Sequence, residues 1–241
     1  MNIRLFFTPA GIGEEQINGR TAVVIDILRA TTVAAVALGN GAREIIPVTN
    51  LGDATSLREK LDRSAVQLGG EREGRKVDGF DLGNSPFEYG PDAVENKTVI
   101  LATTNGSAAI LKGGEAKYCL SCAFVNLTAT LEKILEIKDD VSVICAGNKG
   151  GFSLEDALCG GMLVDKLLAS GGNMELDNDA AFVAQDLYHR HKDNLEEALH
   201  KSDHGKYLDS LGFSNDVSFC AQKDSLSICP FWQSGRLTLL E

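Results

Sequence analysis

Residues 21–38 read TAVVIDILRATTVAAVAL, and this stretch decides the fold class. Its first part is an apolar, β-branched run that ends on Asp26, as expected for a strand covered on both faces. From Ala30 to Leu38 the pattern predicts a helix. A buried strand followed closely by a helix is the first half of a βαβ unit, so we expect a parallel sheet.

The same alternation continues along most of the chain. The other predicted strands are 44–48, 65–68, 98–102, 115–120 and 141–146, and the other predicted helices are 50–62, 105–111, 124–136 and 154–169. Strands that alternate with helices build a mostly parallel sheet with helices on both faces. We therefore predict an α/β fold with three layers, α/β/α.

The chain carries no linker or internal repeat, so we expect one α/β domain over residues 1–241. Its last part, about 173–241, is more polar and more helical and could form a second lobe. Within it, 217–220 and 236–240 could supply one or two edge strands. The segment 69–90 lacks periodicity, and loops of that length are usually functional or poorly ordered.

Composition narrows the class of protein. With 34 acidic and 23 basic residues among 241, the formal charge is −11, which argues against binding nucleic acid or an anionic membrane. The most apolar stretch is interrupted by Asp26 and Arg29, and the N-terminal apolar run is too short for a signal peptide. We expect a cytoplasmic protein whose anionic ligands meet a local basic pocket.

The cysteines and histidines suggest structural roles. Cys119 and Cys122 form a lone CxxC, for which core packing is favoured over a redox or metal pair. His200 and His204 are one helical turn apart and could bind zinc. The residues between them, 201–203, indicate a helix break, so solvated surface positions are favoured for both histidines.

Polar residues follow four of the predicted strands. In open parallel sheets, ligands bind beyond the carboxyl ends of the strands. The candidates there are Asp26, Arg29, Glu71, Arg72, Thr103, Thr104, Asn105, Gly106, Ser107, Asn148, Ser153, Glu155 and Asp156. A purely structural protein has little reason to repeat this arrangement four times.

Several of these residues suit an anion. The run 103–107 would present backbone N–H groups and hydroxyls at the start of a helix, which favours a bound phosphate or sulfonate over a simple N-cap. Arg29 and Arg72 carry guanidinium groups that match phosphate or carboxylate oxygens. The alternative for both arginines is a structural ion pair with Asp26 or Glu71.

The carboxylates suit a hard divalent cation. Magnesium takes one or two carboxylates together with waters and substrate phosphate. The candidate ligands are Asp26, Glu71, Asp81, Glu155 and Asp156. For Ser153 and Asp156 a capping box at the helix start explains the residues equally well. The spacing of the residues does not match four motifs of other phosphate-binding or nucleotide-binding proteins. These are the Cys-x5-Arg loop, the Asp-x-Asp pair, the nucleotide-triphosphatase loop and the dinucleotide fingerprint.

Taken together, five blocks of sequence resemble the 2-phosphosulfolactate phosphatase family. They are 24–32 (VIDILRATT), 70–72 (GER), 79–86 (GFDLGNSP), 103–106 (TTNG), and 145–148 (CAGN) with 153–156 (SLED). The resemblance implies an α/β fold of its own kind with a mixed sheet, a homodimer, and Mg²⁺-dependent hydrolysis of 2-phospho-3-sulfolactate on a route to coenzyme M. It implies catalytic roles for Asp26, Arg29, Glu71, Arg72 and Asp81.

On this interpretation the arginines and the 103–107 turn would divide the phosphate, sulfonate and carboxylate of the substrate among them. Asn84 and Ser85 could bind the sulfonate or carboxylate, although a turn begun by Asn-Ser-Pro explains them equally well. Whether water attacks directly or Asp26 forms an acyl phosphate stays open. The alternatives are a non-catalytic module that binds a phosphorylated metabolite, a phosphatase for another small phosphorylated acid, and a nucleotide-dependent enzyme.

Overall fold

The computed structural model describes residues 1–239, and within this range eleven strands form one mixed sheet with the order β5-β4-β6-β3-β11-β10-β7-β2-β8-β1-β9. The strands are β1 (Asn2–Phe6), β2 (Thr21–Ile25), β3 (Glu44–Val48), β4 (Val66–Arg72), β5 (Arg75–Lys76), β6 (Thr98–Ala102), β7 (Tyr118–Cys122), β8 (Val141–Cys145), β9 (Glu175–Leu176), β10 (Phe231–Gln233) and β11 (Arg236–Thr238). The predicted α/β class is confirmed.

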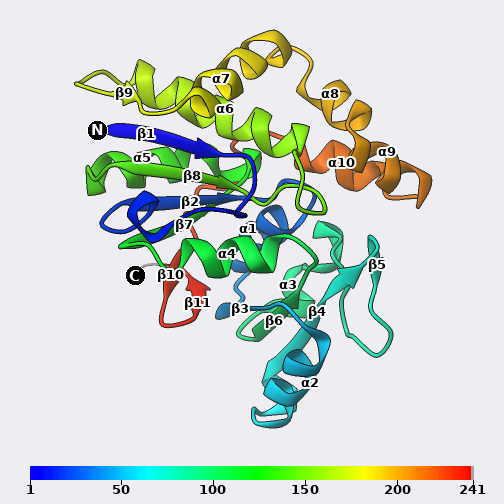
Figure 1. The fold of residues 1–241 in the computed structure, drawn as a ribbon. Helices are drawn as coiled ribbons and strands as arrows, with labels where there is room; N and C mark the ends of the chain where they lie inside the picture. Colours follow the sequence, from blue (N-terminus) through cyan, green and yellow to red (C-terminus); the bar gives the residue numbers. More distant parts are fainter. Residues whose placement is uncertain (240–241) are drawn as a thin grey trace.

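Helices cover both faces of this sheet (Figure 1). They are α1 (Ala30–Gly39), α2 (Leu51–Glu59), α3 (Pro91–Val94), α4 (Gly106–Gly113), α5 (Leu127–Ile137), α6 (Leu154–Ala169), α7 (Asp179–His191), α8 (Leu195–Lys201), α9 (Asp203–Ser210) and α10 (Ser214–Cys220). None of the helices in residues 1–239 is both long and apolar enough to cross a membrane.

The sheet consists of two parallel groups joined by a C-terminal hairpin. Strands β4, β6 and β3 are parallel, as are β7, β2, β8, β1 and β9. Between them, β11 pairs antiparallel with β3 through Leu237 and Ile45, and β10 pairs antiparallel with β7 through Phe231 and Leu120. The strand predicted at 236–240 is thus present as β11 up to Thr238, with residue 240 outside the described residues, but it is wrong as an edge strand because β11 lies inside the sheet.

The predicted strand at 217–220 is also wrong, because these residues lie in α10. Val217 and Cys220 are both buried, and their spacing of three residues places them on one face of a helix. The segment 69–90 is structured: β4 extends to Arg72, pairs with β5, and is followed by a 3-10 turn at Pro86–Glu88.

Two apolar clusters lie on opposite faces of the sheet. On β2, Val23 and Ile25 pack toward α6, whereas Ala22 and Val24 pack toward α1 and α4. The same alternation separates the CxxC pair. Cys119 belongs to one cluster and Cys122 to the other, so both thiols are core residues that face away from each other.

The carboxyl ends of the two parallel groups meet. The backbone N–H of Lys149, after β8, donates to Asn105 Oδ1, after β6, at 3.2 Å. Helix α9 closes the same region, since the Tyr207 hydroxyl donates to the Glu73 carbonyl at 3.0 Å. Segments far apart in the sequence therefore surround one place in the fold.

Candidate functional site

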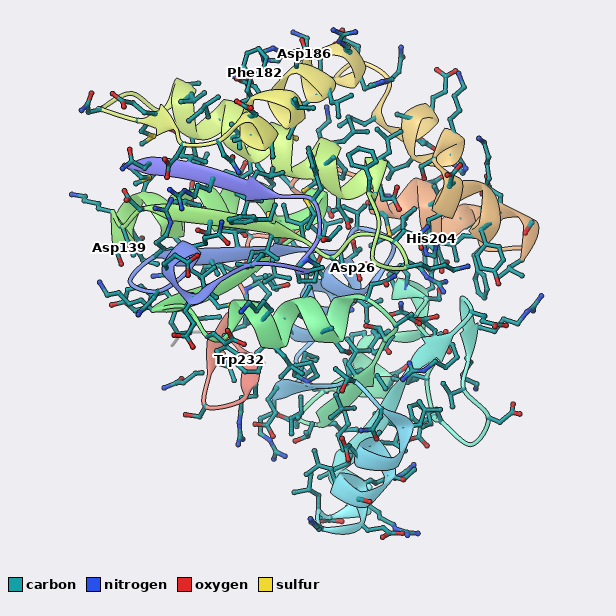
Figure 2. All side chains as sticks on the ribbon, viewed as in Figure 1. Asp26, Asp139, Phe182, Asp186, His204 and Trp232 are labelled. Atoms are coloured by element: carbon teal, nitrogen blue, oxygen red, sulfur yellow. The ribbon has the colours of Figure 1, made fainter. Side chains whose placement is uncertain are left out.

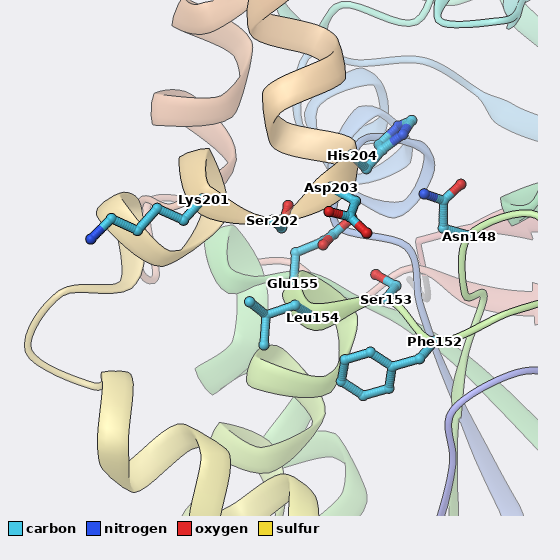
Figure 3. Close-up of a pocket in the computed structure, with 9 residues that line it drawn as sticks. All are labelled: Asn148, Phe152, Ser153, Leu154, Glu155, Lys201, Ser202, Asp203 and His204. Carbon is cyan, nitrogen blue, oxygen red and sulfur yellow. The ribbon is translucent and has the colours of Figure 1, made fainter.

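Two cavities open where these strand ends meet. The larger, of about 630 Å³, is lined by Glu71, Arg72, Glu73, Gly74, Thr104, Asn105, Asn148, Lys149, Asp203, His204 and Tyr207. The smaller, of about 210 Å³, is lined by Asn148, Phe152, Ser153, Leu154, Glu155, Lys201, Ser202, Asp203 and His204 (Figure 3). Asn148, Asp203 and His204 border both cavities, so the two form one site.

Asp26 lies at the end of the central strand β2 and is 8% exposed. Its Oδ1 accepts a hydrogen bond from the Ala30 N–H at 3.2 Å, which fixes the carboxylate at the start of α1. Burial raises the pKa of Asp26 from its ordinary value of 3.8 to about 7. The carboxylates of Glu71 and Glu155 act in the same direction on this pKa, so both lie near Asp26, although Asp26 itself is outside the walls of both cavities.

Glu71 is 8% exposed and is held by three hydrogen bonds. Its Oε1 accepts from both the N–H and the hydroxyl of Thr104 at 2.8 Å, and its Oε2 accepts from the Gly74 N–H at 2.8 Å. These contacts orient the carboxylate at the wall of the larger cavity.

Glu155, in the first turn of α6, is 3% exposed and accepts no hydrogen bond from any residue in the range 1–239. Figure 3 shows its side chain directed toward Asp203, whereas Lys201 points away. Because Glu155 lines the smaller cavity, water or a cation can reach its carboxylate there.

Asp156 has a different role from Glu155. Its Oδ1 accepts from the Ile27 N–H at 2.8 Å and its Oδ2 from the Gly147 N–H at 3.1 Å, so it joins the loops after β2 and β8. Burial, Asp26 and Glu155 raise its pKa well above the ordinary value. Ser153 Oγ accepts the Asp156 N–H at 3.3 Å, so the expected capping interaction of Ser153 is present.

Asp81 does not join the other carboxylates. Its Oδ2 accepts the Leu68 N–H at 2.8 Å and lies 3.0 Å from Arg58 of α2. The structure therefore places Asp81 in an ion pair beside α2 and outside the walls of both cavities.

Arg29 is buried and forms an ion pair with Asp216 of α10 instead of with Asp26 or Glu71. It also donates to the Gly74 carbonyl at 2.8 Å, and its guanidinium carbon lies 4.5 Å from the centre of the Phe213 ring. The alternative of a structural ion pair is therefore present, but its expected partner, Asp26 or Glu71, is wrong, and Arg29 lies outside the walls of both cavities.

Arg72 borders the larger cavity, but its guanidinium donates hydrogen bonds to backbone carbonyls. One terminal nitrogen donates to the carbonyls of Glu71 at 2.7 Å and Ala102 at 3.3 Å, and the other donates to the Thr49 carbonyl at 3.0 Å. Arg72 thereby links the carboxyl ends of β4, β6 and β3.

Within the 103–107 turn, several N–H and hydroxyl groups form hydrogen bonds with one another. The Ser107 N–H donates to Thr103 Oγ1 at 2.9 Å, and the Thr103 N–H donates to Ser107 Oγ at 3.0 Å. Thr104 and Asn105 line the larger cavity, whereas Thr103 is buried. Gly106 packs against Asp26, since a Cβ built there would lie 2.5 Å from Asp26 Oδ2.

Asn84 and Ser85 lie in the turn before Pro86 and outside both cavity walls. The Ser85 hydroxyl donates to Asp216 Oδ1 at 2.9 Å. Ser85 therefore supports the carboxylate that pairs with Arg29. Asn84 is buried, and its Oδ1 accepts no hydrogen bond within residues 1–239.

His204, labelled in Figure 2, is half-buried and lies in the wall of both cavities, so it is not the fully solvated residue that the sequence favours. Burial lowers its pKa, with Arg29 acting in the same direction and Glu155 and Glu71 opposing it. The helix break at 201–203 is confirmed, because Ser202 ends α8 and caps α9. That cap places Asp203 and His204 in a first helical turn that faces the site.

The carboxylates of the site are oxygen donors of the kind that magnesium prefers. Asp26, Glu71 and Glu155 are buried oxygen donors whose negative charges repel one another, and Glu155 lacks any donor among the described residues. Within residues 1–239, no three or more His, Cys, Asp or Glu side chains are arranged so that they could hold a metal ion by themselves. Mg²⁺ usually binds one or two carboxylates and completes its octahedron with water and substrate phosphate.

Comparison with known proteins gives one family. A family model described as 2-phosphosulpholactate phosphatase matches residues 6–235. A protein of Clostridium beijerinckii named probable 2-phosphosulfolactate phosphatase is 38% identical over 238 residues, covering 99% of each chain. One of Clostridium novyi with the same name is 39% identical over 238 residues, covering 99% of this chain and all of the relative. A third such protein, from Caldanaerobacter subterraneus subsp. tengcongensis, is 36% identical over 235 residues, or 98% of this chain and 97% of the relative.

Proposed function

The chain belongs to the 2-phosphosulpholactate phosphatase family, and from that premise we propose that it is a Mg²⁺-dependent phosphatase. Its substrate is 2-phospho-3-sulfolactate, which it hydrolyses to sulfolactate and inorganic phosphate on a route to coenzyme M. In this reaction the P–O bond to the alcohol breaks, the oxygen of water becomes bonded to phosphorus, and the alcohol receives a proton.

The observation that carries the proposal is the convergence of Asp26, Glu71 and Glu155 where four strand ends meet. A receptor for phosphate gains nothing from three carboxylates beside its ligand, because they repel it. A magnesium site, by contrast, uses one or two such carboxylates as ligands. When bound, Mg²⁺ supplies positive charge that offsets the charge on the phosphoryl oxygens.

The residues of the chain position the reacting groups. Asp26, oriented by the Ala30 N–H, and Glu71, oriented by Thr104 and Gly74, provide fixed metal ligands, and Glu155 is the third candidate ligand. His204 presents an imidazole at the border of the two cavities. Burial lowers the pKa of this imidazole, which favours its neutral form.

Phosphate release from 2-phospho-3-sulfolactate tests the proposal, measured with Mg²⁺, with a chelator, and after Mg²⁺ is restored. We expect release with Mg²⁺, loss with the chelator, and recovery. Glu155→Gln should lower kcat/KM by at least about tenfold, because it removes a negative charge from the metal site. Metal-independent binding of the phosphoester without turnover would instead identify a receptor.

Acid quench during turnover distinguishes the two routes for the nucleophile. A phosphorylated protein that is lost in Asp26→Asn would identify Asp26 as the attacking group, and direct attack by water leaves no such species. The proposal also includes a homodimer in the cytoplasm. Light scattering on the purified chain measures the first property, and fractionation of the source cells measures the second.

A further inference from the structure

We propose that Lys149 binds the second acid group of the substrate, the sulfonate or carboxylate carried beside the phosphoester, and so selects polyanionic substrates. The inference rests on the proposed phosphatase function and names a residue to which the sequence assigned no role. Lys149 lies in the wall of the larger cavity, together with Arg72 and Asn105.

The other cations near the site are already engaged. The Arg29 guanidinium pairs with Asp216 and the Gly74 carbonyl, and it is buried away from both cavity walls. Three hydrogen bonds from Arg72 go to backbone carbonyls. By contrast, the Lys149 ammonium makes no ion pair or hydrogen bond with any residue in the range that the structure describes.

The backbone of Lys149 is held firmly. Asn148 and Gly151 exchange two hydrogen bonds, from N–H to carbonyl, at 3.0 and 2.9 Å across the turn that carries Lys149. Lys149 itself has φ +52°, in the left-handed region, and its N–H donates to Asn105 Oδ1 at 3.2 Å. The turn therefore presents the lysine stem at a defined point beside the loop after β6.

The wall of the larger cavity carries negative charge, so a second acid group on the ligand needs a cation beside it. Glu71, Glu73 and Asp203 line the same cavity, so a second negative group on the ligand is repelled unless a positive charge faces it. An ammonium is a compact charge with three donors that can approach sulfonate or carboxylate oxygens from several directions. Lys149 supplies that charge on the side of the cavity formed by the loop after β8.

Three phosphoesters of secondary alcohols test the inference. 2-Phospho-3-sulfolactate carries a carboxylate and a sulfonate, 2-phospholactate carries only the carboxylate, and isopropyl phosphate carries neither. Lys149→Gln keeps a polar side chain and removes the charge, whereas Lys149→Arg keeps the charge. Lys60→Gln is the matched control, since it removes one exposed positive charge at the end of α2, far from the site (Figure 1).

For Lys149→Gln we expect kcat/KM on 2-phospho-3-sulfolactate to fall about tenfold to a hundredfold, mainly through KM, and to stay within about twofold on isopropyl phosphate. A matching loss on 2-phospholactate assigns Lys149 to the carboxylate, and an unchanged value assigns it to the sulfonate. Lys149→Arg should recover most of the loss. Equal losses on all three esters, no loss on any, or the same loss in Lys60→Gln would overturn the inference.

Calorimetric binding of sulfolactate separates this inference from the proposed function. Lys149→Gln should weaken sulfolactate binding by about tenfold or more whether or not the chain hydrolyses phosphoesters. A wild-type chain that binds sulfolactate through Lys149 but releases no phosphate would contradict the proposed function alone. A chain that releases phosphate, and whose Lys149→Gln variant binds sulfolactate as tightly as the wild type, would contradict the subsite alone.

Discussion

Arg29 and Asp216, which are 187 residues apart in the chain, form a buried ion pair that joins the loop after β2 to helix α10. The Ser85 hydroxyl donates to the other oxygen of Asp216, and Phe213 covers the guanidinium. The helices α8–α10, which carry Asp203 and His204 to the site, are therefore fixed to the sheet through Arg29.

Removing one partner of this pair leaves the other charge buried without compensation. Asp216→Ala should lower the free energy of unfolding by about 3–5 kcal/mol, measured by urea denaturation. The control is Asp186→Ala, which breaks an exposed pair with Arg190 and should cost less than about 1 kcal/mol. A loss in Asp216→Ala no larger than the control would show that the Arg29 pair does not hold the C-terminal helices.

Gly106 allows the close approach of α4 to Asp26. A Cβ at Gly106 would lie 2.3 Å from the Ala30 Cβ and 2.5 Å from Asp26 Oδ2, which is far inside van der Waals contact. Gly106→Ala should therefore displace Asp26 and lower kcat/KM for phosphate release by at least about tenfold. Gly52→Ala, at an exposed position in α2, should leave it unchanged. Full activity in Gly106→Ala would remove Asp26 from the reacting centre.

The raised pKa of Asp26 predicts a pH-dependent stability. Between 3.8 and about 7 the folded chain retains a proton on Asp26 that the unfolded chain has lost, so this residue lowers the stability progressively as pH rises through that window. In the presence of a chelator, Asp26→Asn should gain free energy of unfolding relative to the wild type between pH 4 and pH 7, and the difference should be constant above pH 7. A difference that shrinks as pH rises would contradict the assigned environment of Asp26.

Sequence patterns predicted the central α/β layers because their signals are local. The apolar strands β2, β6 and β8 follow from short β-branched runs, and Asp26 and Glu71 follow from the rule that parallel strands present ligands at their carboxyl ends. The hairpin of β10 and β11 could not be placed in this way. Its position inside the sheet depends on Leu237 filling a gap between two parallel groups, a contact that spans most of the chain.

Long-range packing also limits what the sequence can predict about the site. Asp81 lies within the segment 69–90 after β4, yet it pairs with Arg58 of α2 and not with Asp26. His204 lies in a polar helix, which is typical of a surface residue, and only the packing of α9 against the strand ends brings it to the cavities. Local sequence indicates which residues can do chemistry, whereas long-range packing determines which of them meet.

Calorimetric titration of the metal-free chain with Mg²⁺ tests the central claim most directly. The wild type and Asp81→Asn should bind the ion with equal affinity, because Asp81 is paired with Arg58 beside α2 and is not among the carboxylates that act on Asp26. Asp26→Asn and Glu155→Gln should each weaken binding by at least about tenfold, since each removes a negative charge from the place where three carboxylates converge. Undiminished binding in both of these variants, or an equal loss in Asp81→Asn, would contradict the assignment of the metal to Asp26, Glu71 and Glu155.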